Sequence, residues 1–341
     1  MDAALPTATR PAARPLGSAA PYSMRRIVNS DAEEQAASLR EWNQVYQQLS
    51  PGPFAGSLDE YCFRAIQIFR ETTSQSVHEA GGAWPGARTI GVPLRLEGLA
   101  LYRGVPFGVE SLLTFGDGEE LDLYTPRSLD ILGITIEEQA LRTYAEQIEH
   151  RDADALFGRS HVITPNPARL DELRRFLLSV LNSLAVNPGA LHFEESQRLL
   201  EHSIMAATIA VFVDQDEAAS PRAPCPSRHH VVERARAYMQ ARIDEPITVT
   251  DLCVFLGVSR RTLQYSFHEV LGQNPVRFLR ALRLNGVRRD LKAAKPARRS
   301  IQDIAAAWGF WHLGHFVADY KRMFGELPSE TMRRDHRPAI A

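Results

Sequence analysis

A short basic segment near residue 260 carries side chains suited to chemistry with a nucleic acid. An arginine can hydrogen-bond a guanine edge with two donors, and a glutamine amide can pair in the same way with adenine. Residues three and four apart on a helix share one face. We therefore expect a helix whose outward residues face the major groove, namely Ser259, Arg260, Arg261, Gln264, Tyr265 and His268.

A second segment further along the chain has a similar outward face with fewer base-reading groups. Its small residues Gly314 and Ala318 suit contact with thymine methyl groups, and its cations suit phosphates. Two of its histidines lie three residues apart and could also ligate a metal, although we favour a DNA-facing role. The predicted DNA contacts here are His312, His315, Lys321 and Arg322.

Both segments belong to an internal repeat. Val249–Val258 aligns with Ile301–Phe310, and the match continues after one inserted residue. Such self-similarity indicates a duplicated structural unit. The matching pairs are Asp251 and Asp303, Leu252 and Ile304, Gly257 and Gly309, Leu263 and Phe316, Phe267 and Tyr320, Gly272 and Gly325, and Pro275 and Pro328.

Each copy has the pattern of a helix-turn-helix. Thr248 and Ser300 are good N-caps, with an aspartate three residues after each of them. Gly257 and Gly309 provide a tight turn before the second helix. The intervening segment Val276–Ala293 predicts one helix of about 18 residues, or roughly 27 Å. That length approaches the ~34 Å between successive major grooves on one DNA face, so one chain can reach two of them.

The charge of the chain is divided unevenly. Residues 227–341 contain 20 Lys and Arg against 11 Asp and Glu, a balance of +9, which leaves 19 against 30, or −11, for residues 1–226. A basic block of this kind is typical of a domain that binds a polyanion. We expect the partner to be double-stranded DNA.

The acidic part predicts a mixed fold. Short strand-like runs between Leu58 and Ile136, separated by Gly and Pro, favour a small barrel or sandwich, and we predict a small cupin-like β-barrel. Helical spacing follows over Glu137–His150, Pro167–Val186 and Leu191–Val213, and a further helical stripe precedes the strands over Asp31–Leu49. The predicted class is α+β. Its domains are a disordered tail (1–30), an effector-sensing and dimerising domain (31–213), a linker (214–230), a DNA-binding domain (231–334) and a tail (335–341).

The repeat resembles the AraC/XylS-type bacterial transcription regulators. Val258–Gln264 with Phe267 resembles their first recognition helix, and Ile301–Ala305, Gly309, Phe316, Tyr320, Gly325 and Pro328 resemble their C-terminal signature. Tyr320 stands where the family usually has Phe. The resemblance implies a DNA-binding regulator that contacts RNA polymerase, forms a homodimer and responds to a small molecule.

Further similarity points to the regulators of ethanolamine operons within that family. It rests on Trp42–Gly52, Gln67–Glu71, Trp84-Pro85 and Trp308–Gly314. The resemblance implies activation of catabolic genes by ethanolamine together with adenosylcobalamin. A different small-molecule effector remains open.

Candidate effector residues are Trp84, Tyr102 and Glu110, because aromatic rings and carboxylates attract small cations. The rival interpretation is a cupin-like metalloenzyme, but the strand-rich segment contains His78 alone and no His-x-His pair. We expect no enzyme activity and no metal. The three cysteines form no CxxC pair, no apolar run is long enough to cross a bilayer, and we expect a cytoplasmic protein.

Overall fold

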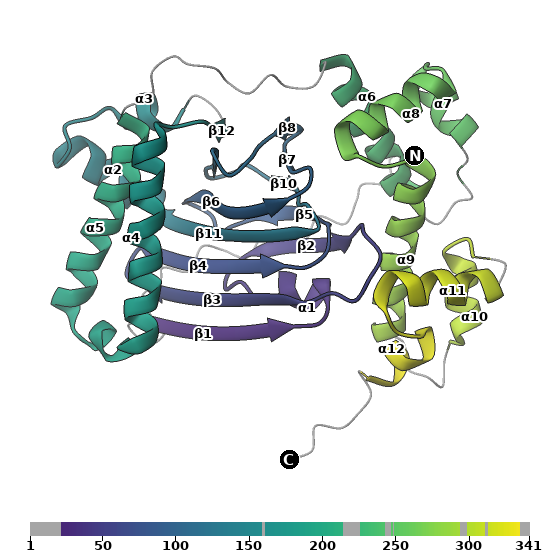
Figure 1. Ribbon diagram of the computed structural model, residues 1–341, viewed down its shortest axis with the longest axis horizontal. Helices are drawn as coiled ribbons and strands as arrows, with labels where there is room; N and C mark the ends of the chain where they lie inside the picture. The colour runs from purple at the N-terminus through teal and green to yellow at the C-terminus, as the bar shows by residue number, and fades with distance from the viewer. Residues whose placement is uncertain are drawn as a thin grey trace.

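The computed structural model describes residues 22–158, 161–213, 226–242, 247, 249–293, 299–310 and 313–334. Figure 1 shows strands flanked by helices in residues 22–213, the N-terminal unit, and helices in residues 226–334, the C-terminal unit. The predicted mixture of sheet and helix, with a helical C-terminal part, is confirmed. Among the described residues, no helix is both long and apolar enough to span a membrane.

The N-terminal unit contains two antiparallel sheets. The order of the seven-stranded sheet is β1 (Tyr22–Asn29), β3 (Gly56–Phe63), β4 (Ile66–Thr73), β11 (Ser128–Glu137), β6 (Ala87–Glu97), β9 (Leu112–Phe115) and β12 (Val162–Ile163). The order of the five-stranded sheet is β2 (Asn43–Gln48), β5 (Val77–Gly82), β10 (Leu121–Tyr124), β7 (Leu101–Tyr102) and β8 (Val105–Pro106).

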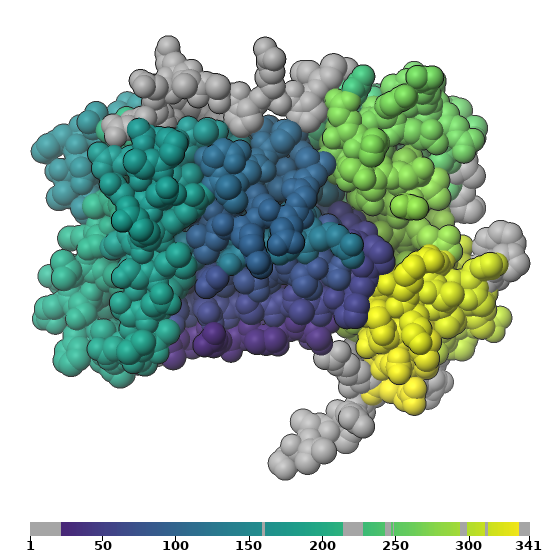
Figure 2. All heavy atoms as spheres, in the orientation of Figure 1, coloured from purple at the N-terminus to yellow at the C-terminus, as the bar shows by residue number. Residues whose placement is uncertain are grey.

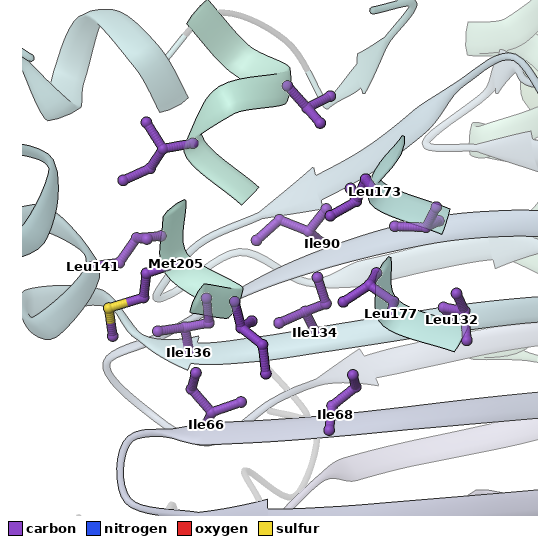
Figure 3. Close-up of a cluster of buried hydrophobic side chains, with 14 of the residues drawn as sticks. Ile66, Ile68, Ile90, Leu132, Ile134, Ile136, Leu141, Leu173, Leu177 and Met205 are labelled. Atoms are coloured by element: carbon purple, nitrogen blue, oxygen red, sulfur yellow. The ribbon is translucent and has the colours of Figure 1, made fainter. Parts of the chain in front are cut away.

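One face of the seven-stranded sheet packs against helices. These are α2 (Glu138–Gln147), α3 (Ala153–Phe157), α4 (Pro167–Val186), the 3-10 helix η1 (Pro188–His192) and α5 (Glu194–Val213). Alternate residues of a strand point to opposite faces, so the aliphatic side chains of β11 divide between this layer and the second sheet. Each fully buried aliphatic side chain contributes about 1.5–3 kcal/mol. Figure 3 shows this core, with Ile66, Ile68, Ile90, Leu132, Ile134 and Ile136 beside Leu141, Leu173, Leu177 and Met205.

The predicted small barrel does not close, because both sheets are open. Within the described ranges, no pairing links an edge of one sheet to an edge of the other. Edge strand β2 is covered by helix α9 (Pro275–Ala293) instead. The backbone N–H of Gln48 donates to Asn285 Oδ1 (3.1 Å), and the Asn285 amide donates to the Gln48 carbonyl oxygen (2.8 Å). A helix side chain thus occupies the place that a neighbouring strand would take in a closed barrel.

The start of the chain differs from the prediction of a disordered tail over residues 1–30. Tyr22–Asn29 form β1, which pairs with Gly56–Phe63 along its whole length. Residues 1–21 lie outside the described residues. The strand has no clear apolar alternation of its own because only one of its faces is partly covered.

The helix predicted over Asp31–Leu49 is also wrong for most of its length. It is reduced to α1 (Ala32–Ala36), and β2 follows. Tyr46 is buried because its hydroxyl donates to the Glu71 carboxylate (3.1 Å) on a neighbouring layer, a long-range contact. Spacing of three and four therefore arises here across a short helix, a turn and a strand, whose residues are buried for separate reasons.

The C-terminal unit consists of two small helical bundles that share α9. The first bundle contains α6 (Pro226–Ala241), α7 (Val249–Leu256) and α8 (Arg260–Leu271), and the second contains α10 (Ile301–Ala307), α11 (Leu313–Phe324) and α12 (Pro328–Arg334). Helix α6 begins inside the predicted linker, whose residues 214–225 lie outside the described ranges, as do residues 335–341.

The two units meet through α9 and the first residues of the N-terminal unit, and Figure 2 shows them in contact along one side of the sheets. Asp31 caps α1 and also binds Arg288 (2.5 Å) and Lys292 (2.6 Å) of α9. Burial alone would raise the pKa of Asp31, but the charges of Arg288 and Lys292 outweigh it and lower that pKa to about 2. The same guanidinium binds Glu326 (2.7 Å), so Arg288 ties α9 to both units.

A second polar contact joins α6 to the N-terminal unit. Arg236 binds Asp122 (3.1 Å) and lies over the Tyr124 ring, 4.6 Å from its centroid. The Nε2 atom of His78 lies 2.8 Å from the same Asp122 carboxylate, which accepts the hydrogen bond when Nε2 carries a proton, and the His78 ring stacks on Tyr124. Burial and the Arg236 charge oppose protonation of His78 and lower its pKa, although Asp122 favours the protonated form.

We predict that Asp31→Asn lowers the free energy of unfolding by about 2–3 kcal/mol at neutral pH. Asparagine can still cap α1, so the loss in free energy of unfolding reports the removal of the Asp31 charge and not the loss of the cap. The pKa of Asp31 is lower in the folded chain (about 2) than its ordinary value of 3.8, so the stabilisation is present above pH 3.8 and disappears as the pH falls through about 2. Urea unfolding of both proteins across this range measures the difference.

The matched control is Asp59→Asn, whose partner Arg26 is 81% exposed. Exposed pairs contribute about 0–1 kcal/mol. A loss for Asp31→Asn no larger than that of Asp59→Asn would contradict the proposed importance of the buried pair.

Candidate nucleic-acid interface

The first helix-turn-helix is built from α7 and α8. Gly257 adopts a φ of +66° at the turn between them, in the left-handed region that glycine enters without steric cost. Ser259 then caps α8, because its hydroxyl accepts the backbone N–H of Thr262 (3.1 Å). Both features are those that the sequence predicts. Thr248, the predicted cap of α7, lies outside the described residues.

Burial separates the two faces of α8 as the helical period predicts. Leu263, Phe267 and Val270 are 0–1% exposed and pack into the first bundle. The opposite face is open to solvent, and all six predicted DNA contacts of this bundle lie on it or at its start: Ser259, Arg260, Arg261, Gln264, Tyr265 and His268.

Arg261 is held flat on this open face. Its guanidinium lies over the Tyr265 ring, 5.2 Å from the centroid, and one of its nitrogens donates to the Tyr265 hydroxyl (3.3 Å). A planar fork fixed in this way loses less entropy when it pairs with a base edge. The role of Tyr265 as a support for Arg261 was not part of the sequence prediction, although their spacing of four residues signals it.

The second helix-turn-helix repeats this plan. Ser300 and Asp303 form a capping box at the start of α10, and Gly309 adopts a φ of +77° at the turn. Phe316 and Tyr320 of α11 are fully buried, whereas His315 and Lys321 are exposed. His312 lies outside the described residues. Among the described residues, no cluster of three or more potential metal ligands occurs.

Arg322 has surroundings that the sequence does not reveal. It binds Asp319, which also binds Arg280 of α9. Arg322 lines a cleft that faces the N-terminal unit. A contact between Arg322 and a DNA phosphate would therefore compete with its ion pair to Asp319.

Both bundles border one side of α9. A groove of about 460 Å³ is lined by α7 residues Val249 and Leu252 and by α11 residues His315 and Phe316. Between them lie Val276, Leu279, Arg280 and Arg283 of α9, together with Ile247, Pro275, Gly309 and Phe310. The two helix-turn-helix units thus lie at the two ends of α9 (Figure 1), and this groove runs between them.

Sequence reasoning missed the basic face of α9. Arg277, Arg280 and Arg283 follow each other at intervals of three along this helix. Burial lowers the pKa of Arg283, which lies beside the turn at Gly309. The signal was available as a repeated Arg at helical spacing, but the helix was predicted only as a spacer.

Among the described residues, the three candidate effector residues do not lie together in one cluster. Tyr102 is completely buried beside Phe115 and His161, and its hydroxyl has no hydrogen-bond partner among the described residues. Trp84 is partly buried, and Glu110 is exposed. Within the described ranges no recorded contact joins the three, so their common role stays a prediction.

Comparison with known families matches residues 252–334 to the family described as "Helix-turn-helix domain". The matched range contains α8 to α12 and most of α7. This range includes the exposed residues of α8 and α11, the second helices of the two helix-turn-helix units. The geometry of the repeat and the family comparison therefore agree on the same part of the chain.

Several known proteins are similar to this chain. A probable thc operon regulatory protein of Rhodococcus erythropolis is 34% identical over 159 residues, which covers 44% of this chain and 48% of that protein. The XylDLEGF operon transcriptional activator 3 of Pseudomonas putida is 25% identical over 290 residues and 82% of each chain. A solved structure of a probable AraC family transcriptional regulator from Rhodopseudomonas palustris CGA009 is 35% identical, covers 32% of this chain and 99% of that chain, and has a TM-score of 0.30.

The match thus spans about half the length of the first of these relatives. The matched domain is a helix-turn-helix domain, and these two relatives are described as an operon regulatory protein and an operon transcriptional activator. A particular closeness to regulators of ethanolamine operons is not shown by these proteins.

We predict that Arg261→Ala and Gln264→Ala each cost about 1–3 kcal/mol in binding to a selected DNA site and relax base preference at one position. Fluorescence anisotropy with the selected duplex and its single-base variants measures both effects. The matched control is Arg198→Ala, an exposed helix arginine of the N-terminal unit. Equal losses on selected and random duplexes would show that these residues contact phosphates only.

For Lys321→Ala we expect weaker binding to every duplex, because an exposed ammonium at this place suits a phosphate. The slope of log affinity against log salt should become shallower by about one. Titrations at several salt concentrations give the slope directly. A loss confined to one sequence, with the slope unchanged, would assign Lys321 to base recognition instead.

Proposed function

We propose that this chain is a sequence-specific regulator of transcription of the AraC/XylS type, on the basis of the helix-turn-helix domain matched over residues 252–334. The observation that carries the proposal is the duplicated bundle around α9. Each copy has a capped helix, a glycine turn and a second helix with one buried and one exposed face. The exposed residues of α8 supply bidentate donors for base edges, and those of α11 supply mainly a cation for phosphate.

We propose further that the regulator activates an operon together with RNA polymerase. A P. putida relative described as an operon transcriptional activator aligns with 82% of this chain, which supports activation over repression. The N-terminal unit would act as the sensor, a cupin-like pair of facing sheets, and as the site of homodimer formation. Exposed Val186 on α4, beside a surface hollow that includes Leu178, supports a contact between copies there.

The mechanism that we propose is a shift between two arrangements of the same folded units. An effector that binds one arrangement more tightly than the other raises the population of that arrangement. The size of the shift is set by the difference between the two affinities. The contacts of Asp31 with Arg288 and of Asp122 with Arg236 connect the units in the arrangement described here. A change in these contacts would alter how α9 presents both helix-turn-helix units to DNA.

Ethanolamine with adenosylcobalamin is one effector pair to be tested, and another small molecule is the alternative. Tyr102 favours a small cation in one respect, because its buried hydroxyl lacks a partner in the described part of the chain. A corrinoid does not fit beside it, and a small cation would reach it only through an opening of the core, because Tyr102 is 0% exposed and enclosed. The proposed contacts of Trp84, Tyr102 and Glu110 are therefore with a small cation and not with adenosylcobalamin.

Selection of duplexes from a random library by the full chain tests the regulatory proposal. We expect enrichment of a site with two half-sites one helical turn apart, because each bundle can occupy one major groove. Transcription from a promoter that carries this site should rise when the chain is present. Failure to enrich any sequence over random DNA would refute sequence-specific regulation.

Calorimetry of the same protein with ethanolamine, alone and together with adenosylcobalamin, decides between the effector alternatives. Heat of binding at a stoichiometric ratio would support the first alternative. Absence of binding by both ligands, with DNA selection intact, would leave a different effector.

A further inference from the structure

The C-terminal end of α11 is capped by two groups of the N-terminal unit. The last four carbonyl groups of a helix have no partner within that helix. The Met323 carbonyl oxygen is one of these four in α11. It accepts the backbone N–H of Gly52 (3.1 Å) and the side-chain amide of Gln48 (2.8 Å). A helix that is proposed to face DNA is therefore hydrogen-bonded directly to the N-terminal unit.

Gln48 joins this cap to α9. Its backbone N–H and carbonyl oxygen both bind Asn285, while its side-chain amide binds the end of α11. The same amide nitrogen lies 2.8 Å from the Ser50 carbonyl oxygen and 2.7 Å from the Gly52 carbonyl oxygen. Gln48 is 2% exposed, so these acceptors have little access to water in its place. The residue thus holds the loop Leu49–Pro53 against α11.

The loop Leu49–Pro53 is in turn fixed to both sheets. It lies on the connection from β2 of the five-stranded sheet to β3 of the seven-stranded sheet. The Ser50 hydroxyl donates to Gln75 Oε1 (2.6 Å), and the Gln75 amide donates to the Pro53 carbonyl oxygen (3.1 Å). Gln75 lies between β4 and β5, which belong to different sheets. The position of the loop therefore depends on how the two sheets lie relative to each other.

The two copies of the repeat differ at this point. Gly325 and its counterpart Gly272 both adopt a positive φ after their helices, +77° and +64°. A Cβ atom at Gly325 would lie 2.7 Å from Pro53 Cγ, whereas at Gly272 the nearest contact would be Leu99 Cδ2 at 3.9 Å. Among the described residues, no hydrogen bond from the N-terminal unit reaches α8. The N-terminal unit therefore holds α11 more directly than it holds α8.

This contact leaves the outer face of α11 open. His315 and Lys321 are exposed while the N-terminal unit is in place, whereas Met323 is 5% exposed. A contact that blocked DNA would cover the outer face of the helix. The cap instead fixes one end of α11 and leaves that face accessible.

We propose that Gln48 and Gly52 position α11 for DNA, so that the N-terminal unit sets the affinity for one half-site more strongly than for the other. Gln48 is a positioning residue, because it acts through the Met323 carbonyl group and contacts no base. The inference rests on the proposed function, since it gives this contact a role in DNA recognition. A change in the spacing of the sheets would move the loop and thereby alter binding at the α11 half-site.

Titration of Gln48→Met with three duplexes tests this role, because methionine is similar in length and has no donor. The duplexes are the selected one, one with the α8 half-site scrambled and one with the α11 half-site scrambled. The α8 half-site is the one at which Arg261→Ala relaxes base preference. We expect about three- to tenfold weaker binding to the two duplexes that keep the α11 half-site, and unchanged binding to the third.

The matched control is Gln67→Met. Gln67 is 1% exposed, and its hydrogen bonds to Trp42, Glu60 and Arg40 stay within the N-terminal unit. This variant also loses a buried amide, so it reports what a loss of stability alone does to DNA binding. We expect the relative affinities for the three duplexes to stay as in the unchanged chain.

Hydrogen exchange at the Gly52 amide measures the contact itself. Exchange should be faster in Gln48→Met and in Gly325→Ala, whose new Cβ atom would displace Pro53. Gly272→Ala carries similar backbone strain and should leave the Gly52 amide unchanged. Addition of the selected duplex should slow exchange at Gly52, because coupling between two sites is reciprocal. The duplex with a scrambled α11 half-site should have no such effect.

Equal weakening on all three duplexes would show that Gln48 is structural only and would overturn the inference, as would unchanged binding to all of them. Faster exchange at Gly52 on addition of the selected duplex would show that the contact opposes DNA binding, with the same consequence. Gly325→Ala on the same duplexes gives the result if Gln48→Met does not fold. These outcomes reject the positioning role alone when the unchanged chain selects a sequence, whereas failure to select any sequence rejects the proposed function.

Discussion

The packing of α9 on three sides is the constraint on which the rest of the structure depends. Phe278 and Leu282 belong to the core of the first bundle, and Leu284 belongs to the core of the second. Asn285 and Arg288 point to the N-terminal unit and bind β2 and Asp31. A helix that is enclosed on every side is usually apolar throughout. Here two polar residues are buried because each has partners, and one rigid rod therefore sets the positions of both bundles relative to the sheets.

Local features of the C-terminal unit could be predicted from the sequence because their causes are short-range. The cap at Ser259, the box of Ser300 with Asp303 and the turn at Gly257 each depend on residues within a few positions. The predicted helix from Val276 begins one residue late and ends at the residue found in the structure. Caps, turns and the helical period are properties of short segments, so tertiary contacts had little to override.

Features that depend on distant partners could not be predicted in this way. Strand β1 exists because it pairs with β3, and the open edge of β2 is covered by Asn285, which is 237 positions further along the chain. The helical period correctly places Arg322 outward, but it does not reveal that the neighbouring Asp319 also binds Arg280 of α9, 39 positions earlier in the chain. Hydrophobic spacing identifies which residues need burial but does not identify which segment buries them.

The chemical character of the contacts differs between the core of the N-terminal unit and the junction of the two units. The core between the seven-stranded sheet and its helices is aliphatic and close-packed, so any displacement there would expose apolar surface. The junction adds to the apolar contacts of Leu101 and Tyr124 the ion pairs of Asp31 with Arg288 and of Asp122 with Arg236, beside an open cleft. Desolvation of charges offsets much of their attraction, so the net free energy of docking is a small difference between large terms. A ligand or a duplex that binds one arrangement a few kcal/mol more tightly can reverse such a balance, whereas it could not separate the aliphatic layers. Under the proposed function, an effector would therefore act on the junction between the units and leave the aliphatic core of the N-terminal unit unchanged.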